Sequence, residues 1–250
     1  MEPRTRTLLL ILLGAALALG AACVFIGIKA YKTFYYAGSK EEKPQLYAVP
    51  RPLALTPCTV ERTTTLSYSG LSVDLPWTGI VDEKQYDKFN RFRFDSGLAV
   101  LFGKIDETHG PIAMFREQDA ETQRGLEAML GREATGSQYG FYEAMLNTTP
   151  ENITLDTHPS RVIGLRMILL MKEIMLPTGN AELYSFHTES VKGFQIGGGY
   201  RRSVELLAFD SPHGGVAVTV IPPRPPGLRV TQEELNCIAA SIRPAEESKE

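Results

Sequence analysis

Residues 91–94 (RFRF), the turn at residues 95–97 (DSG) and residues 98–102 (LAVLF) decide the fold class of this chain. Basic and aromatic residues alternate in the first run, which places Phe92 and Phe94 on one face of a strand. The turn and the second apolar run complete the pattern of a β-hairpin. Basic–aromatic alternation can also serve nucleic-acid stacking, but two phenylalanines on one strand face are what a core requires. We therefore interpret the hairpin as part of a packed sheet.

More strand patterns lie on both sides of a helical middle region. The expected strands are residues 71–75, 184–187, 193–196, 203–209 and 216–221, and the expected helices are residues 119–130, 139–146, 161–176 and 231–242. Thr231 and Glu234 form a capping box at the start of the last helix. This order predicts an α+β domain over residues 58–243, with one antiparallel sheet packed with helices.

The helix at residues 161–176 (RVIGLRMILLMKEIML) is the strongest in this region. Its polar residues form two narrow stripes and apolar residues fill both gaps between them, so it is either buried on two faces or offers one face to a partner. Met167, Met171 and Met175 recur every four residues. They are a candidate partner face for another protein or for a second copy of the chain, and the alternative is core packing.

Residues 8–28 (LLLILLGAALALGAACVFIGI) contain no charged residue, and a helix of this length would span a bilayer of roughly 30 Å. We interpret them as an uncleaved transmembrane signal-anchor that contacts the lipid bilayer, since the apolar part of a cleaved signal peptide is shorter. A lipoprotein with Cys23 as its lipidated residue is the alternative. Gly14, Ala18 and Ala22 form a candidate helix-packing stripe, and the favoured alternative is that small residues are simply common in export segments.

The other expected segments are short. They are an N-terminal tail (residues 1–7), a charged and proline-broken linker (29–57) and a charged tail (244–250). Lysines after the apolar stretch favour a cytoplasmic domain by the positive-inside rule. Cys58 and Cys237, near the two ends of the domain, instead favour an oxidising compartment and a disulfide, and the alternative is two unrelated thiols. We therefore expect an extracytoplasmic domain, either periplasmic or at the cell surface.

Composition and motifs exclude several classes of function. The net charge of −3 and the 22% of charged residues give no electrostatic reason to expect a nucleic-acid partner. The four histidines and two domain cysteines show no zinc-ligand spacing, and neither a phosphate-binding loop nor a nucleophile elbow is present. We therefore expect no cofactor, no metal site and no recognisable catalytic residue.

Residues 71–77 (LSVDLPW) and the closing helix at residues 231–242 give the order of elements a resemblance to PsbP-like α+β sandwich domains. The resemblance covers residues 70–243, and the long helical middle region departs from that family's compact pattern. Since its members serve as binding or assembly factors, the resemblance implies a non-catalytic role.

The expected function is a membrane-anchored binding or assembly module at a bacterial envelope. The alternative is an envelope-anchored hydrolase or ligand-processing enzyme of an unfamiliar type. A deep pocket in which separated polar residues such as His187 and Glu189 converge with a nucleophile would favour the enzyme.

Overall fold

The computed structural model describes residues 19, 20, 23, 27, 40–56, 63–105, 118–154, 156–176, 182–198, 203–211, 214–223 and 229–245. The elements in this part of the chain are α2 (Pro44–Tyr47), β1 (Arg51–Pro52), β2 (Thr64–Tyr68), β3 (Leu71–Leu75), β4 (Ile80–Gln85), β5 (Phe89–Phe94), β6 (Ala99–Ile105), α4 (Ala120–Leu130), α5 (Arg132–Gly136), α6 (Gln138–Asn147), the 3-10 helix η1 (Pro150–Asn152), α7 (Pro159–Met175), β7 (Leu183–His187), β8 (Lys192–Ile196), β9 (Val204–Ser211), β10 (Gly214–Ile221), α8 (Gln232–Ser241) and β11 (Arg243–Pro244). The predicted α+β class is confirmed.

The prediction of one antiparallel sheet is wrong. The strands form an eight-stranded sheet in the order β1-β7-β8-β9-β10-β6-β5-β4 and a three-stranded sheet in the order β11-β3-β2. The large sheet is mixed, because β1 runs parallel to β7 while the other neighbours are antiparallel. Arg51 of β1 stabilises this edge, since it donates a hydrogen bond of 3.0 Å to the Tyr184 hydroxyl and lies over that ring. Part of the expected linker at residues 29–57 therefore belongs to the fold.

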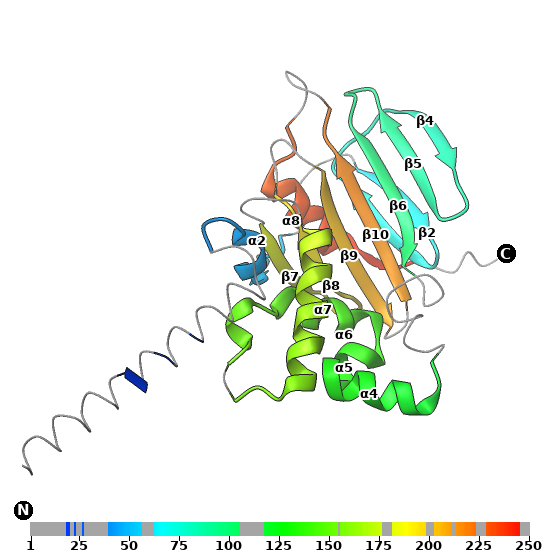
Figure 1. Ribbon diagram of the computed structural model, residues 1–250. Helices are drawn as coiled ribbons and strands as arrows, with labels where there is room; N and C mark the ends of the chain where they lie inside the picture. The colour runs from blue at the N-terminus through cyan, green and yellow to red at the C-terminus, as the bar shows by residue number, and fades with distance from the viewer. Residues whose placement is uncertain are drawn as a thin grey trace, which may run out of the picture.

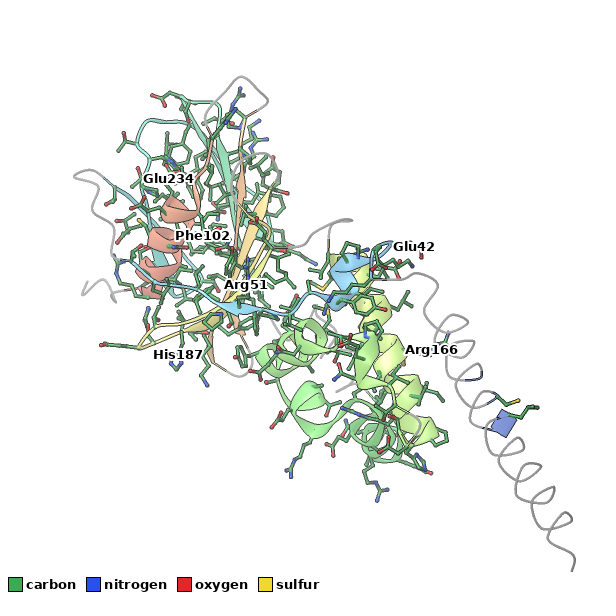
Figure 2. All side chains as sticks on the ribbon, turned by 90° about the vertical axis from the view of Figure 1, so that its left-hand side faces the viewer. Glu42, Arg51, Phe102, Arg166, His187 and Glu234 are labelled. Carbon is green, nitrogen blue, oxygen red and sulfur yellow. The ribbon has the colours of Figure 1, made fainter. Side chains whose placement is uncertain are left out.

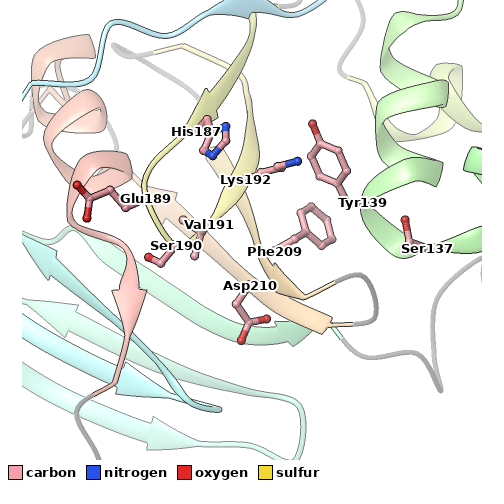
Figure 3. Close-up of a pocket in the computed structure, with 9 residues that line it drawn as sticks. All are labelled: Ser137, Tyr139, His187, Glu189, Ser190, Val191, Lys192, Phe209 and Asp210. Carbon is pink, nitrogen blue, oxygen red and sulfur yellow. The ribbon is translucent and has the colours of Figure 1, made fainter.

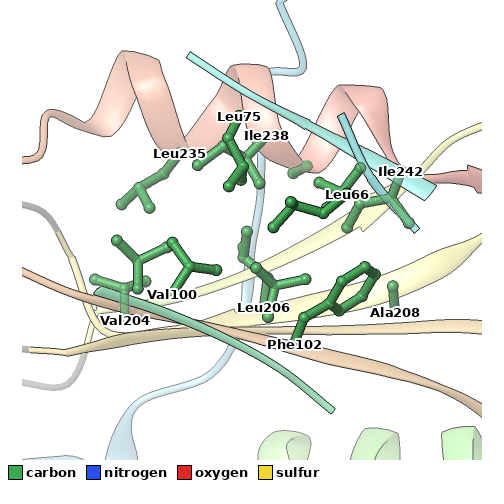
Figure 4. Packing of buried hydrophobic residues seen from close by; sticks show 14 of the residues in the cluster. Leu66, Leu75, Val100, Phe102, Val204, Leu206, Ala208, Leu235, Ile238 and Ile242 are labelled. Atoms are coloured by element: carbon green, nitrogen blue, oxygen red, sulfur yellow. The ribbon is translucent and has the colours of Figure 1, made fainter. Parts of the chain in front are cut away.

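The small sheet and α8 cover one face of the large sheet. Every second residue of β9 points to this side, so Val204, Leu206 and Ala208 join the buried cluster there (Figure 4). The predicted capping box of α8 is confirmed, and the Glu234 carboxylate also accepts a hydrogen bond of 2.9 Å from the Trp77 indole. The start of α8 is thereby fixed to the segment that follows β3.

Helices α4 to α7 cover the opposite face over β7 to β10, and β4 and β5 extend beyond them (Figure 1). Figure 2 places Arg166 of α7 and Glu234 of α8 on opposite sides of the molecule, with Phe102 of the sheet between them. The close approach of α4 and α7 depends on Gly164, because a Cβ atom there would collide with the carbonyl oxygen of Met129. Arg161 adds a hydrogen bond of 2.8 Å to the same oxygen.

Lys172 of α7 is completely buried and joins three segments of the helical side. Its ammonium group donates hydrogen bonds of 2.6, 2.8 and 2.7 Å to the carbonyl oxygens of Ala48, Leu146 and Thr148. Ala48 and Thr148 are the C-caps of α2 and α6, where helix carbonyls lack partners within the helix. Burial lowers the pKa of Lys172 to about 8, so the side chain keeps its three donors at neutral pH.

The expected transmembrane helix at residues 8–28 is contradicted. No helix in the described part of the chain is both long enough and apolar enough to cross a membrane. Crossing takes about 20 consecutive apolar residues, whereas α7, with 17 residues, carries four charged side chains. Most of the stretch lies outside the described residues, and residues 19, 20, 23 and 27 are helical.

Several other expectations fall wholly or partly outside the described residues. Gly14, Ala18 and Ala22 lie there, so the candidate helix-packing stripe stays a prediction. Cys23 is an exposed free thiol. Cys237 is buried in α8 and takes part in a disulfide. Because Cys58 is outside the described residues, its pairing with Cys237 stays a prediction.

We predict that Lys172→Met lowers the free energy of unfolding by about 3 kcal/mol, since two buried carbonyl groups and one partly buried carbonyl group lose their donor. Denaturant unfolding of the full chain measures this loss. The matched control is Lys43→Met, which removes a partly exposed ion pair with Glu173 at the end of the same helix. It should cost about 1 kcal/mol or less. Equal losses in the two variants would contradict the structural role of Lys172.

We predict that thiol labelling under denaturing, non-reducing conditions modifies Cys23 alone. Labelling after reduction should modify all three cysteines and serves as the control for access to the thiols. If both Cys58 and Cys237 react before reduction, the expected disulfide does not form.

Candidate functional site

The three methionines of the candidate partner face lie in two different environments. Met171 and Met175 are partly buried against the core under the helical layer, so they belong to the packing of α7 on its neighbours. Met167 is 38% exposed. Core packing therefore accounts for Met171 and Met175, and only Met167 remains accessible to a partner.

An exposed apolar stripe nevertheless follows the outer face of α7. It consists of Ile163, Met167, Leu170 and Ile174, which are 53%, 38%, 59% and 75% exposed. The intervals of four, three and four residues keep these side chains on one helix face, as in the seam of a coiled coil. We call this set the α7 stripe. The sequence predicted this helix. Because its apolar residues occur on more than one side, the sequence did not show which of them would be exposed.

A pocket of about 290 Å³ lies between α6 and the β7–β8 hairpin (Figure 3). It is lined by Ser137, Tyr139, His187, Glu189, Ser190, Val191, Lys192, Phe209 and Asp210. Strand register explains part of this grouping: His187 of β7 lies opposite Lys192 of β8, which lies opposite Phe209 of β9. The three side chains thus form a row across the sheet at the edge of the helical layer.

Tyr139 of α6 forms the wall above this row. Its ring stacks on Phe194 with the centroids 5.3 Å apart and meets Phe209 edge-on at 5.8 Å. The Lys192 ammonium lies 5.7 Å from the centroid of the same ring. Burial, and then the hydrogen bond donated to Glu143, raise the pKa of Tyr139 to about 12, so the phenol stays neutral.

The pocket brings His187 and Glu189 together with two serines, as the enzyme alternative requires, but one serine hydroxyl has a structural role. The Ser137 hydroxyl caps α6 by accepting a hydrogen bond of 2.9 Å from the Gly140 amide. Ser190 lies in the hairpin turn, where its amide donates to the Thr188 hydroxyl. No hydrogen bond among the described residues joins His187 to either serine or to a carboxylate, so these pocket residues do not form a nucleophile–base pair. His158 and Ser160 are hydrogen-bonded at 2.8 Å, but they lie at the exposed start of α7 and do not line the pocket.

Metal binding finds no support in the described residues, where no three histidine, cysteine, aspartate or glutamate side chains form a group that could hold an ion. His109 and His213 lie outside these residues. Ser137, Tyr139 and Asp210 were not singled out from the sequence. Ser137 and Tyr139 reach the pocket through the packing of α6 on the sheet, and Asp210 reaches it because β9 pairs with β8.

Glu205 is the partly buried acid of the sheet face under the helical layer. It lies opposite Ile196 of β8 and Thr219 of β10. Burial raises the pKa of its carboxyl group. Burial, and then the nearby Glu205 carboxylate, raise the pKa of Tyr142 to about 12. Neither group lines the pocket, although the ring of Tyr142 lies 5.6 Å from that of Phe209, centroid to centroid.

The chain matches no protein-family model and no curated protein. Its resemblance to PsbP-like domains therefore stays a prediction.

We predict that Glu205→Gln stabilises the protein at neutral pH and that this difference disappears in acid. The folded state binds the Glu205 proton more tightly than the unfolded state does. The free energy of unfolding of the wild type therefore falls as the pH rises from the unfolded pKa to the raised folded pKa. Below this interval the carboxyl group is neutral in both states, so the variant and the wild type become equally stable.

Denaturant unfolding at a series of pH values measures this difference. The control is Glu83→Gln on the exposed strand β4, whose stability difference from the wild type should not change with pH in this way. A Glu205→Gln protein that is less stable than the wild type at neutral pH would contradict the prediction.

Proposed function

We propose that this protein is a non-catalytic assembly module that associates with a second copy of itself through the α7 stripe. The single observation that carries the proposal is the row of four exposed aliphatic side chains on α7. Exposed apolar side chains grouped on one surface are typical of protein–protein contacts.

The spacing of the stripe favours another helix as the partner. Intervals of four, three and four residues fit the side chains of a facing helix between them, as knobs fit into holes. A twofold axis centred between Met167 and Leu170 would pair Met167 with Leu170 of the second copy. It would also pair Ile163 with Ile174. Every contact along such an antiparallel pair is apolar, so the stripe is complementary to itself.

One charge beside the stripe is compensated within the chain. Glu173 is neutralised by Lys43 of the same chain, with the ion pair at 2.5 Å. No charged residue stands within the stripe, so pairing would bury no charge in its centre.

The size of the stripe predicts a reversible dimer. A stable interface buries roughly 800 Å² on each partner, and four partly exposed side chains offer less. Association through α7 should therefore depend on protein concentration.

An extracytoplasmic location is part of the same proposal. The disulfide that includes Cys237 supports it, because disulfides persist in oxidising compartments and are rare in the cytosol.

Sedimentation of the full chain over a range of concentrations tests the proposal. We expect the wild type to shift from monomer to dimer as the concentration rises. Leu170→Glu should remain monomeric, because it places a charge in the centre of the apolar contact. Leu170 is 59% exposed, so the substitution leaves the core intact.

The matched control is Val81→Glu, which changes an aliphatic residue of β4 that is 63% exposed and distant from α7. This variant should associate like the wild type. A wild type that stays monomeric at every concentration would contradict self-association. Association that survives in Leu170→Glu would contradict the role of the α7 stripe.

A further inference from the structure

We propose that the pocket between α6 and the β7–β8 hairpin binds a small organic monocarboxylate with a flat apolar body. The proposal is independent of association through α7. It rests on the size of the pocket, on the ammonium group of Lys192 beside the Tyr139 ring, and on the placement of the acidic side chains away from that ring.

The size of the pocket limits its ligand to a small molecule. Its volume of about 290 Å³ is at the lower end of the range for ligand pockets. The pocket thus suits a ligand of about the size of one ring with one substituent. A polymer, a nucleotide or a long lipid chain would not fit within it.

The basic side of the pocket is suited to binding an anion. Lys192 is exposed and makes no ion pair with any described residue, so its ammonium group is available to a ligand. His187 stands directly across the strand pair from Lys192 and can supply an N–H donor beside it. The N-terminal end of α6, a helix of 10 residues that begins at Gln138, adds the positive end of its dipole to the same pocket.

The aromatic side of the pocket is suited to an apolar body. Tyr139 is held by stacking on Phe194 and by its edge contact with Phe209. The ring is therefore fixed before a ligand enters, so binding a flat ligand beside it would cost the protein little conformational entropy. The raised pKa of Tyr139 keeps this wall uncharged.

The acidic side explains why we infer a single carboxylate. Figure 3 shows the carboxylate groups of Glu189 and Asp210 directed away from Tyr139, on the side of the pocket remote from its ring. A second negative charge on the ligand would approach these groups and be repelled. A monocarboxylate can instead place its charge at Lys192 and its apolar body against Tyr139.

Calorimetric titration of the full chain with benzoate tests the proposal, and benzylamine and phenylalanine serve as comparison ligands. We expect benzoate to bind and benzylamine, which has the same ring with a positive charge, to bind at least about tenfold more weakly. Phenylalanine should also bind more weakly than benzoate, because its ammonium group would lie close to Lys192.

Lys192→Gln should weaken benzoate binding by about tenfold, the loss expected for one hydrogen bond to a charged group. Lys192 is exposed, so this variant keeps the fold. The matched control is Lys84→Gln, which removes an exposed lysine of β4 and should bind benzoate like the wild type.

Three outcomes would overturn the proposal: no binding of benzoate at millimolar concentration, tighter binding of benzylamine or phenylalanine, or equal affinity of the Lys192→Gln variant and the wild type. Tighter binding of phenylalanine would mean that the acidic side of the pocket selects an amino group.

Discussion

The ammonium group of Lys172 is the interaction on which the helical side of this protein depends. A buried charge is costly unless its hydrogen bonds are satisfied, and here each of the three N–H donors meets a backbone carbonyl group. Those carbonyls belong to the ends of α2 and α6, so one side chain of α7 fixes the ends of two other helices. Gly164 fixes the same helix against α4.

This fixation determines which side of α7 faces solvent. The side with Lys172 is turned inward, and Met171 and Met175 pack beside it against the core. The α7 stripe is what remains outside. A flexible helix could turn such side chains inward, but a helix held at several positions along its length cannot, so the apolar surface stays available to a partner.

Much of the fold could be predicted from local patterns in the sequence. The alternation at residues 91–94 gave the hairpin β5–β6, and the capping box gave the start of α8, because both signals lie within a few residues. The parallel strand β1 could not be predicted, since a two-residue strand has no pattern of its own and forms only beside β7. The role of Lys172 likewise depends on carbonyl groups that are 24 to 124 residues away.

The candidate site was predictable only in part, for the same reason. His187 and Glu189 were named as residues whose convergence with a nucleophile would favour the enzyme alternative. Both line the pocket, but the row of His187, Lys192 and Phe209 depends on the register of three strands. A basic residue five positions after His187, across a short turn, was the available signal for Lys192. Tyr139 had no such signal, because the packing of α6 on the sheet brings it to the pocket.

Pulsed electron paramagnetic resonance on spin-labelled full chain tests the central claim, antiparallel pairing of α7, most directly. One sample carries the label at Arg166→Cys and the other at Ser160→Cys, both with Cys23→Ser. The account predicts a distance between copies in both samples. Along the helix axis, the labels at residue 160 should be roughly 18 Å further apart than those at residue 166, which is closer to the twofold axis. Equal distances in the two samples, or no distance between copies, would contradict it.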